Sequence, residues 1–253
     1  MRIGILGGTF NPIHFGHIYP ICETVEKLKL DKVLFVPSYS PPHKPDGEII
    51  SAFHRKNMIE LAIEEHSLFE FSDLEINRKG ISYSVDTVTT LMKKEKGDFF
   101  FILGMDAFLE IDTWKDSNLL LKSCNFAVIV RNRIIFSDLL KTVSERLSEK
   151  FRDFQFHCRE TEDKSGLRCI KANSSPYFII PLETTPVDIS STDIRNKIGR
   201  GDSVKGLVPE KVNIYIENKK LSVSSPLARG LIGKVKNEVV EINSPKGLKT
   251  YTI

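Results

Sequence analysis

Two histidines, His14 and His17, lie three residues apart in the stretch GILGGTFNPIHFGH near the N-terminus. An imidazole pair at this spacing could ligate a metal ion, serve as an acid and a base, or donate hydrogen bonds to an anion. Gly7 and Gly8 end the preceding apolar run and let backbone approach a ligand, while Gly16 keeps the space between the histidines open. A strand, a glycine turn and a helix that begins near His17 would direct free N–H groups to one point. The stretch therefore predicts a phosphate-binding site.

Other interpretations of the histidine pair are weaker. Neither an HExxH motif nor a cysteine partner lies nearby, which disfavours zinc. The chain has no GxxxxGK[ST] motif, and GILGG does not match GxGxxG, so neither a P-loop nor a dinucleotide-binding dehydrogenase is supported. An isolated histidine most often caps a helix or packs in a core, but the whole string favours function. Both imidazoles would stabilise charge that grows on phosphate oxygens during phosphoryl or nucleotidyl transfer.

A second stretch, ISSTDIR at residues 189–195, also suits a phosphate. Ser190, Ser191 and Thr192 lie at a predicted helix start, where hydroxyls and free N–H groups can meet phosphate oxygens. Arg195 follows one turn later and adds a forked donor. The hydroxyls could instead serve only as helix caps, whereas a binding role is favoured for the arginine.

The elements that must position these residues alternate along the chain. Short apolar runs rich in β-branched and aromatic residues are separated by helical patterns, which predicts an α/β fold with a mostly parallel sheet flanked by helices. Pro20 is compatible with the first helix if that helix starts near Gly16, because a proline in the first turn removes no helical hydrogen bond. The predicted strands are residues 3–6, 33–36, 69–76, 99–103, 126–130 and 177–180, and the predicted helices are 18–30, 53–65, 84–94 and 137–150.

The C-terminal part of the chain has a different texture. Residues 152–175 are polar and mixed, and we expect irregular strands and loops there. After Leu221 a Ser/Pro-containing link leads to two strand-like pieces, 238–242 and 248–253, separated by a Pro-Lys-Gly turn. The pattern predicts a large domain at 1–221 and a small β-rich appendage at 222–253.

Composition restricts the class of protein. The 253 residues are 41% hydrophobic and 27% charged, and the net charge of +3 does not by itself indicate a nucleic-acid surface. The four cysteines show no CxxC spacing, which fits a reducing compartment. The N-terminal apolar run is too short for a secretory signal, and no run approaches the ~20 residues that span a membrane. We expect a cytoplasmic protein without a membrane contact.

The stretch GGTFNPIHFGH resembles the signature of the H-x-G-H nucleotidyltransferase superfamily, and its GGTF variant resembles bacterial nicotinate-nucleotide adenylyltransferases. Five further blocks agree in order: VPSYSPPHK, EINRKGISYSVDT, LGMDAFLEIDTW, ISSTDIR and LVPEKVNIYI. The resemblance implies a Rossmann-like nucleotidyltransferase fold over about residues 1–221. It also implies the reaction of ATP with nicotinate mononucleotide, which gives nicotinate adenine dinucleotide and pyrophosphate.

The resemblance further implies site residues. The catalytic set would be His14, His17 and Arg195. The ATP side would comprise Gly7, Gly8, Thr9, Phe10, Gly104, Asp106, Ile189, Ser190, Ser191 and Thr192. The mononucleotide side would comprise Lys44, Tyr83, Ser84, Trp114 and Arg131. Mg²⁺ would be carried by the ATP phosphates, and no dedicated protein metal site is expected.

Several of these residues also suit their places in the sequence. Lys44 follows two prolines that stiffen its loop, and its charge suits the mononucleotide phosphate. Trp114, the only tryptophan, could stack on a pyridine ring or fill the core, and the resemblance favours stacking. Asp106 follows the end of an apolar strand and could reach a ribose hydroxyl or cap a helix.

Two blocks depart from the family pattern. SYS stands at residues 82–84 where relatives have SYT, so Tyr83 and Ser84 inherit the contact to the nicotinate carboxylate without the threonine methyl. RNRIIF follows Val130 where relatives often have an RPG-like turn, so Arg131 would approach a phosphate from an altered turn.

Two rival functions remain open at this point. One is another H-x-G-H adenylyltransferase or cytidylyltransferase, and the other is a non-catalytic nucleotide sensor associated with transcription. The second is suggested by the tail, where SPLARGLIGK and two strands resemble the end of Gre-type transcription elongation factors. The coiled-coil arm of that family is missing, so no activity is carried over. We expect the tail to pack, to dimerise or to contact another protein.

Overall fold

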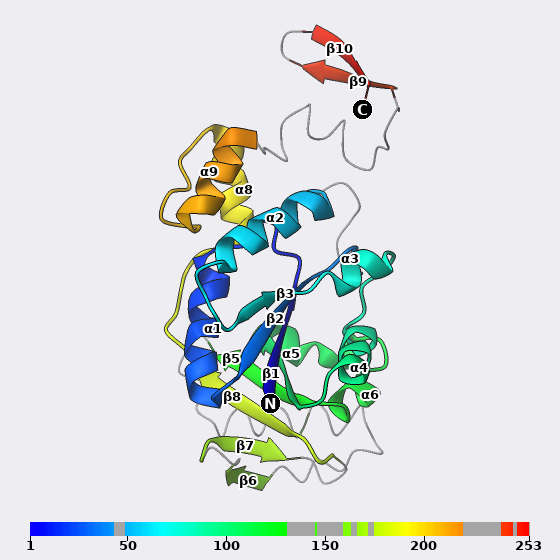
Figure 1. Cartoon of the computed structure of the whole chain (residues 1–253), viewed down its shortest axis with the longest axis vertical. Helices are drawn as coiled ribbons and strands as arrows, with labels where there is room; N and C mark the ends of the chain where they lie inside the picture. Colours follow the sequence, from blue (N-terminus) through cyan, green and yellow to red (C-terminus); the bar gives the residue numbers. More distant parts are fainter. Residues whose placement is uncertain are drawn as a thin grey trace.

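The computed structural model describes residues 1–42, 49–130, 145, 159–162, 166–171, 175–219, 239–244 and 247–252. Within these residues, eight strands form one mostly parallel sheet that lies between helices (Figure 1). Across the sheet the strands are β3 (Phe69–Phe71), β2 (Lys32–Pro37), β1 (Arg2–Gly8), β4 (Asp98–Gly104), β5 (Asn125–Val130), β8 (Phe178–Glu183), β7 (Arg168–Lys171) and β6 (Arg159–Glu162). The first six strands in this order run parallel to one another. β7 is antiparallel to β8, and β6 is antiparallel to β7. The predicted α/β fold is confirmed.

The helices cover both faces of the sheet and belong to two apolar cores. One core includes side chains from α1 (Phe15–Leu28), α2 (Ala52–Ile63), α8 (Ser191–Arg200) and α9 (Glu210–Lys219). The other includes side chains from α3 (Leu74–Arg78), α4 (Ser84–Lys94), α5 (Met105–Leu109), the 3₁₀ helix η1 (Ile111–Thr113) and α6 (Ser117–Leu121).

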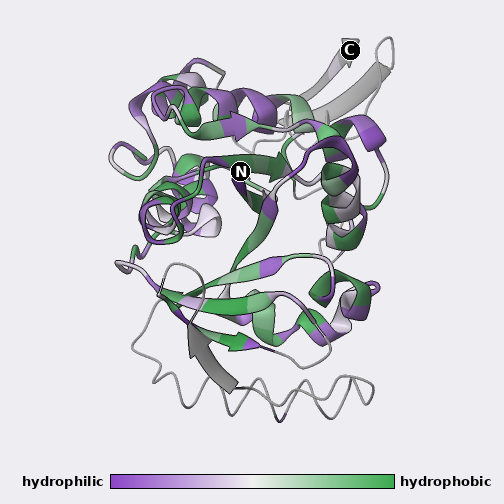
Figure 2. Ribbon diagram, turned by 60° about the horizontal axis from the view of Figure 1, so that its bottom comes forward, coloured by the Kyte–Doolittle hydropathy of each residue, from purple (hydrophilic) through white to green (hydrophobic). Residues whose placement is uncertain are grey.

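Side chains of the central strands alternate between these two cores. Phe99 and Phe101 of β4 pack on the α4 side, whereas Phe100 and Ile102 pack on the α1 side. Because both faces are covered, the strands read in sequence as continuous apolar runs rather than as alternating ones. Figure 2 shows these strands mostly in the hydrophobic colour. The apolar runs rich in β-branched and aromatic residues therefore indicated strands, and the helical patterns between them indicated a parallel sheet.

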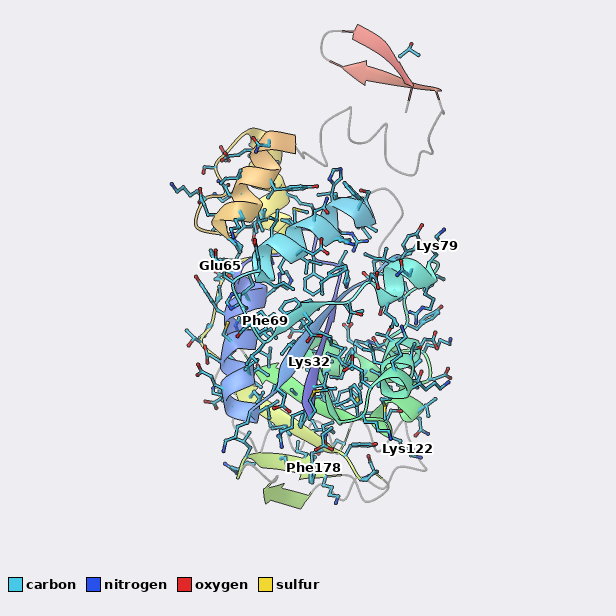
Figure 3. The ribbon with its side chains drawn as sticks, in the orientation of Figure 1. Lys32, Glu65, Phe69, Lys79, Lys122 and Phe178 are labelled. Atoms are coloured by element: carbon cyan, nitrogen blue, oxygen red, sulfur yellow. The ribbon has the colours of Figure 1, made fainter. Side chains whose placement is uncertain are left out.

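Ion pairs tie β2 to its neighbours at the end of the sheet where the strand begins. Lys32 Nζ lies 3.0 Å from Glu70 Oε2 on β3 and 2.8 Å from Glu95 Oε2 at the end of α4. Figure 3 shows Lys32 and Phe69 on the two neighbouring strands. The carboxyl ends of the parallel strands lie at the opposite end of the sheet.

The strand order creates a topological switch point between β1 and β4. From β1 the chain continues through α1 to β2 and β3 on one side, whereas β4 leads to β5 on the other side. In open parallel sheets, ligands bind in the crevice at the carboxyl ends of the two strands where the order reverses. Here those ends are Gly8 and Gly104.

The predicted strand at 69–76 is wrong in its second half. β3 ends at Phe71, and Leu74–Arg78 forms α3. Ser72 donates its N–H to the Phe35 carbonyl at 3.0 Å, and Asp73 then takes the N-cap position. Serine and aspartate before apolar residues signal a helix start, so the alternating pattern of this segment was misassigned.

The first turn of the fold also differs from the prediction. Gly7 and Gly8 belong to β1 and pair with Val36 and Pro37, so the turn follows the glycines instead of containing them. Helix α1 begins at Phe15, which makes Pro20 its sixth residue and places it beyond the first turn. The Gly16 carbonyl therefore lacks the N–H that residue 20 would normally donate.

Other expectations concern the C-terminal half. Strands β7 and β6 lie within the segment expected to hold irregular strands. The two predicted tail strands are confirmed as β9 (Val239–Ser244) and β10 (Gly247–Thr252), which pair antiparallel. Of the predicted helix at 137–150, only residue 145 is among the described residues, and it is helical. Within the described ranges, no helix is both long and apolar enough to cross a membrane.

Candidate functional site

A cleft of about 310 Å³ lies at the switch point, at the carboxyl ends of β1 and β4. Its walls include one side of the α1 start, the segment that follows β2 and the start of α4. The predicted site residues that line it are Gly7, Gly8, Thr9, His17, Ser84, Gly104 and Trp114. The structure thus brings together predicted site residues from three of the sequence blocks.

The end of β1 is shaped by close contacts around Gly8. A Cβ atom at Gly8 would lie 3.0 Å from the Phe10 ring, so the turn requires glycine there. Phe10 has a φ of 49° and is 2% exposed. Its ring packs edge to face on His17, with 5.2 Å between centroids. The structure therefore places Phe10 in the core, where it supports the His17 ring and does not line the cleft.

The histidine spacing follows from the start of α1. His14 is the N-cap and His17 is the third helical residue, two positions whose side chains meet at a helix start. Their ring centroids are 3.8 Å apart. The His14 backbone N–H donates to His17 Nδ1 at 3.3 Å. An accepting Nδ1 leaves the ring proton on Nε2, so the half-buried His17 presents a donor. His14 is 4% exposed and lies behind it.

Gly16 is needed for close packing between two segments of the site. A Cβ atom there would lie 2.9 Å from His14 Nδ1 and 2.9 Å from the Ile189 carbonyl oxygen. The expectation that this glycine keeps a space open is therefore wrong. Its missing side chain lets the α1 start contact the segment that precedes α8.

The hydroxyls at the α8 start have separate roles. Ser190 is the N-cap, and its Oγ accepts from the Asp193 N–H at 3.1 Å. Ser191 Oγ donates to the Pro12 carbonyl at 2.9 Å. The capping alternative thus holds for Ser190, while Ser191 binds the turn between β1 and α1.

Arg195 also contacts this turn. Its Nη1 donates to the Asn11 carbonyl at 3.0 Å, and its Nη2 donates to Thr192 Oγ1 at 3.2 Å. The structure therefore brings Arg195 beside the histidine turn, but residues 189–195 do not line the cleft. Their contact with a phosphate stays a prediction.

The predicted nicotinate contacts lie at the start of α4. Tyr83 is the N-cap and Ser84 is the first helical residue, which lines the cleft. The Tyr83 ring lies under Lys115 Nζ, 4.6 Å from the ring centroid. Trp114 also lines the cleft and packs edge to face on Phe101, with 6.2 Å between centroids. The tryptophan therefore combines the two alternatives, since it packs against the core and faces the cleft.

Asp106 does not cap helix α5 (Met105–Leu109), and its contact with a ribose hydroxyl stays a prediction. Gly104 is the N-cap of α5, so Asp106 is the second helical residue, and the capping alternative is wrong. Its side chain is exposed and does not line the cleft. A Cβ atom at Gly104 would meet nothing within 4 Å. Lys44 and Arg131 lie outside the described residues.

Sequence reasoning missed several cleft residues. Ser38, directly after β2, is 8% exposed, and its Oγ has no hydrogen-bond partner in the described part of the chain. Glu75 is 6% exposed and accepts from the Thr87 hydroxyl. A polar residue after a strand of the switch region is a signal for Ser38. No such signal marked Glu75, because its segment was read as a strand.

Comparison with known proteins agrees with this geometry. A family model described as cytidylyltransferase-like matches residues 5–197. A probable nicotinate-nucleotide adenylyltransferase of Desulfatibacillum aliphaticivorans is 39% identical over 221 residues, which are 87% of this chain and 99% of that protein. The chain belongs to the nicotinate-nucleotide adenylyltransferase family. A family protein of Geobacter metallireducens is 39% identical over 223 residues, 87% of this chain and 98% of the relative.

Solved structures and a second family model complete the comparison. The nicotinic acid mononucleotide adenylyltransferase of Plasmodium falciparum, solved with APC, has the same fold. Its TM-score is 0.62 at 19% identity, over 87% of this chain and 96% of that one. The model described as transcription elongation factor, GreA/GreB, C-term, matches residues 203–253. Both the predicted family and the resemblance of the tail are confirmed.

Replacing Ser38 tests whether its hydroxyl binds a ligand. We expect Ser38→Ala to weaken binding of nicotinate mononucleotide roughly 2- to 10-fold, because a buried hydroxyl without a protein partner gains one from the ligand. Calorimetric titration measures the effect. Ser123→Ala is the control, since the Ser123 hydroxyl donates to the Leu119 carbonyl outside the cleft. Unchanged affinity in a folded Ser38→Ala protein would remove Ser38 from the binding site.

Proposed function

We propose that this chain transfers an adenylyl group from ATP to nicotinate mononucleotide, giving nicotinate adenine dinucleotide and pyrophosphate in NAD biosynthesis. The observation that carries the proposal is the histidine turn at the switch point of the sheet, in a chain whose relatives of this name align over 221 residues. The test is release of pyrophosphate when purified protein is given ATP, nicotinate mononucleotide and Mg²⁺.

The reaction needs position and charge stabilisation rather than a protein nucleophile. A phosphate oxygen of the mononucleotide attacks the α-phosphorus of ATP in line, the bond from that phosphorus to the β-phosphate oxygen breaks, and pyrophosphate leaves. His17 offers its Nε2 proton to the phosphate oxygens on which charge grows. We propose that Arg195, which lies on α8, stabilises the same developing charge and that His14 supports the His17 ring.

We propose that Mg²⁺ enters with ATP. In the described part of the chain, no three residues of the types His, Cys, Asp and Glu form a group that could hold a metal ion. Mg²⁺ binds in such enzymes mainly through substrate phosphates and water, so a cleft with few carboxylates fits this role. When bound, the ion supplies charge neutralisation on the triphosphate.

The start of α4 supports the choice of a nicotinate ring. The free N–H groups and the partial positive charge of a helix N-terminus favour a carboxylate. Ser84 and Trp114 both line the cleft, so a flat ring that stacks on Trp114 can direct its carboxylate to this helix. Another H-x-G-H transferase would leave these features without a purpose. A nucleotide sensor without catalysis would need neither His17 nor Arg195.

Substitution of the histidines tests the catalytic assignment. We expect His17→Ala to lower turnover on the order of 10²–10³, the range for loss of one transition-state donor. We expect a similar loss for His14→Ala, because the His14 ring packs on His17. Steady-state rates are compared with thermal melting of each variant. His66→Ala is the control, since its ring stacks on Phe69 away from the cleft. Near wild-type turnover in both folded variants would contradict the phosphate-cradle assignment.

Substrate preference tests the assignment of the α4 start. We expect nicotinate mononucleotide to exceed nicotinamide mononucleotide in kcat/KM by on the order of 10–10², because the amide leaves a charge-matched set of donors poorly paired. Both substrates are assayed with ATP and Mg²⁺ on the same preparation. Equal values would count against a carboxylate contact at Tyr83 and Ser84.

We also propose that the catalytic domain ends near residue 221 although the Gre-type match begins at 203. Val212 and Ile216 of α9 are 0% and 5% exposed and belong to the core that includes α1 and α2. Tyr215 Oη lies 2.8 Å from His54 Nδ1 and accepts from Asn57 Nδ2 at 3.0 Å. This packing of α9 against α1 and α2 supports a boundary that follows α9.

Two truncations test this boundary. A chain that ends at Lys220 should keep adenylyl transfer, whereas one that ends at Asp202 loses α9. That loss exposes apolar side chains worth about 1.5–3 kcal/mol each, so a large fall in thermal stability is expected. A tail of about thirty residues is below the ~40 that usually fold alone, so its removal in the chain that ends at Lys220 should also change solubility or association. Activity and light-scattering mass are measured together. Loss of activity from a folded Lys220 truncation of unchanged mass would move the boundary.

A further inference from the structure

Arg55 on α2 is an unusual side chain for the interior of a protein. It is 1% exposed and is the largest of the fully buried side chains in the described part of the chain. Its three hydrogen bonds all go to backbone carbonyls: Nε to Ile50 at 3.0 Å, Nη1 to Thr9 at 2.9 Å and Nη2 to Tyr39 at 3.3 Å. A buried guanidinium is tolerated only when such bonds replace its hydration. The three acceptors belong to three separate segments.

The first segment is the turn that carries the histidines. Thr9 lines the cleft and precedes Phe10, whose φ of 49° makes the backbone turn sharply. The Ile50 N–H donates to Asn11 Oδ1 at 3.2 Å, so Arg55 reaches this turn both directly and through Ile50. Arg195 holds the Asn11 carbonyl from α8. Two arginines on two helices therefore fix one turn.

The second segment forms the other wall of the cleft. Tyr39 follows Ser38, and its N–H donates to Ser82 Oγ at 2.9 Å. Ser82 in turn donates its N–H to the Ser40 carbonyl at 2.9 Å and lines the cleft two residues before Ser84. Arg55 is thus bonded to the wall from which we assign the nicotinate contacts.

The charge of Arg55 persists in the interior. Burial lowers the pKa of its guanidinium to about 10, while the nearby Glu75 carboxylate acts in the opposite direction. The group stays protonated at neutral pH because this pKa lies well above 7. A single ammonium in the same place cannot make the forked pattern of three bonds.

We propose that Arg55 is a positioning residue that fixes the two walls of the cleft relative to each other, and through them aligns ATP with the mononucleotide. The proposal rests on the proposed function for its kinetic readout. One guanidinium bonds to Thr9 on the ATP side and to Tyr39 on the mononucleotide side. A misplacement of about 1 Å can cost on the order of 10² in rate, so both substrates should sense its loss.

The experiment compares Arg55→Lys and Arg55→Met with the wild-type full chain. We expect Arg55→Lys to fold and to lower kcat/KM for ATP and for nicotinate mononucleotide together, each by on the order of 10–10². Arg55→Met leaves three backbone carbonyls without the donor from Arg55 and should also lower the melting temperature. Rates are corrected for the folded fraction. A fall for only one substrate, or none in folded Arg55→Lys, would overturn the proposal.

A matched control separates position from stability. Asn125 is 8% exposed, its Nδ2 donates to the Phe99 carbonyl at 3.2 Å, and its Oδ1 accepts from the Phe178 N–H at 3.0 Å. Asn125→Ala should lower the melting temperature while both kcat/KM values stay unchanged, since Asn125 does not line the cleft. If the wild-type chain shows no turnover, the proposed function fails. In that case the positioning role is tested only by calorimetric titration of the protein with ATP. An ATP affinity of Arg55→Lys equal to that of the wild-type chain would overturn it.

Discussion

The reversal of strand order between β1 and β4 is the constraint on which the rest of this structure depends. Two neighbouring parallel strands send their connections to opposite sides of the sheet, which leaves a crevice at their carboxyl ends, Gly8 and Gly104. The position of the cleft therefore follows from the strand order and does not depend on the side chains that line it. The α1 start and the α4 start then supply donors from the two sides of this crevice.

The turn between β1 and α1, the proposed phosphate site, is held in place by hydrogen bonds from three other parts of the fold. The carbonyls of Thr9, Asn11 and Pro12 accept from Arg55, Arg195 and Ser191, respectively. Each of these hydrogen bonds pairs a carbonyl oxygen with a donor of the protein, and a carbonyl oxygen that is paired in this way does not repel an anion in the cleft. Hydrogen bonds to its carbonyls thus fix the shape of the turn as much as its glycines do.

The sequence predicted those parts of the site that depend on local spacing. The spacing of three positions between His14 and His17 matched the N-cap and third position of a helix, and the apolar runs matched buried parallel strands. The missed parts depend on distant contacts. Arg55 bonds to Thr9 across 46 positions, and the burial of Phe10 follows from its packing on Phe35 and His17. No pattern within a short window carries such contacts. The predicted strand at 69–76 was too long because β3 pairs with β2 over only three residues and α3 follows it.

Helix α2 contacts both the walls of the cleft and helix α9. His54 faces Tyr215 of α9, and the next residue, Arg55, faces the turn that carries the histidines. These adjacent residues point to different partners because successive positions on a helix are about 100° apart. Helix α9 therefore packs on α2, the same helix whose Arg55 bonds to both walls of the cleft. The Gre-type match includes α9, yet α9 packs in the same apolar core as α1 and α2, so we expect a module joined to the proposed catalytic domain to leave this helix in place.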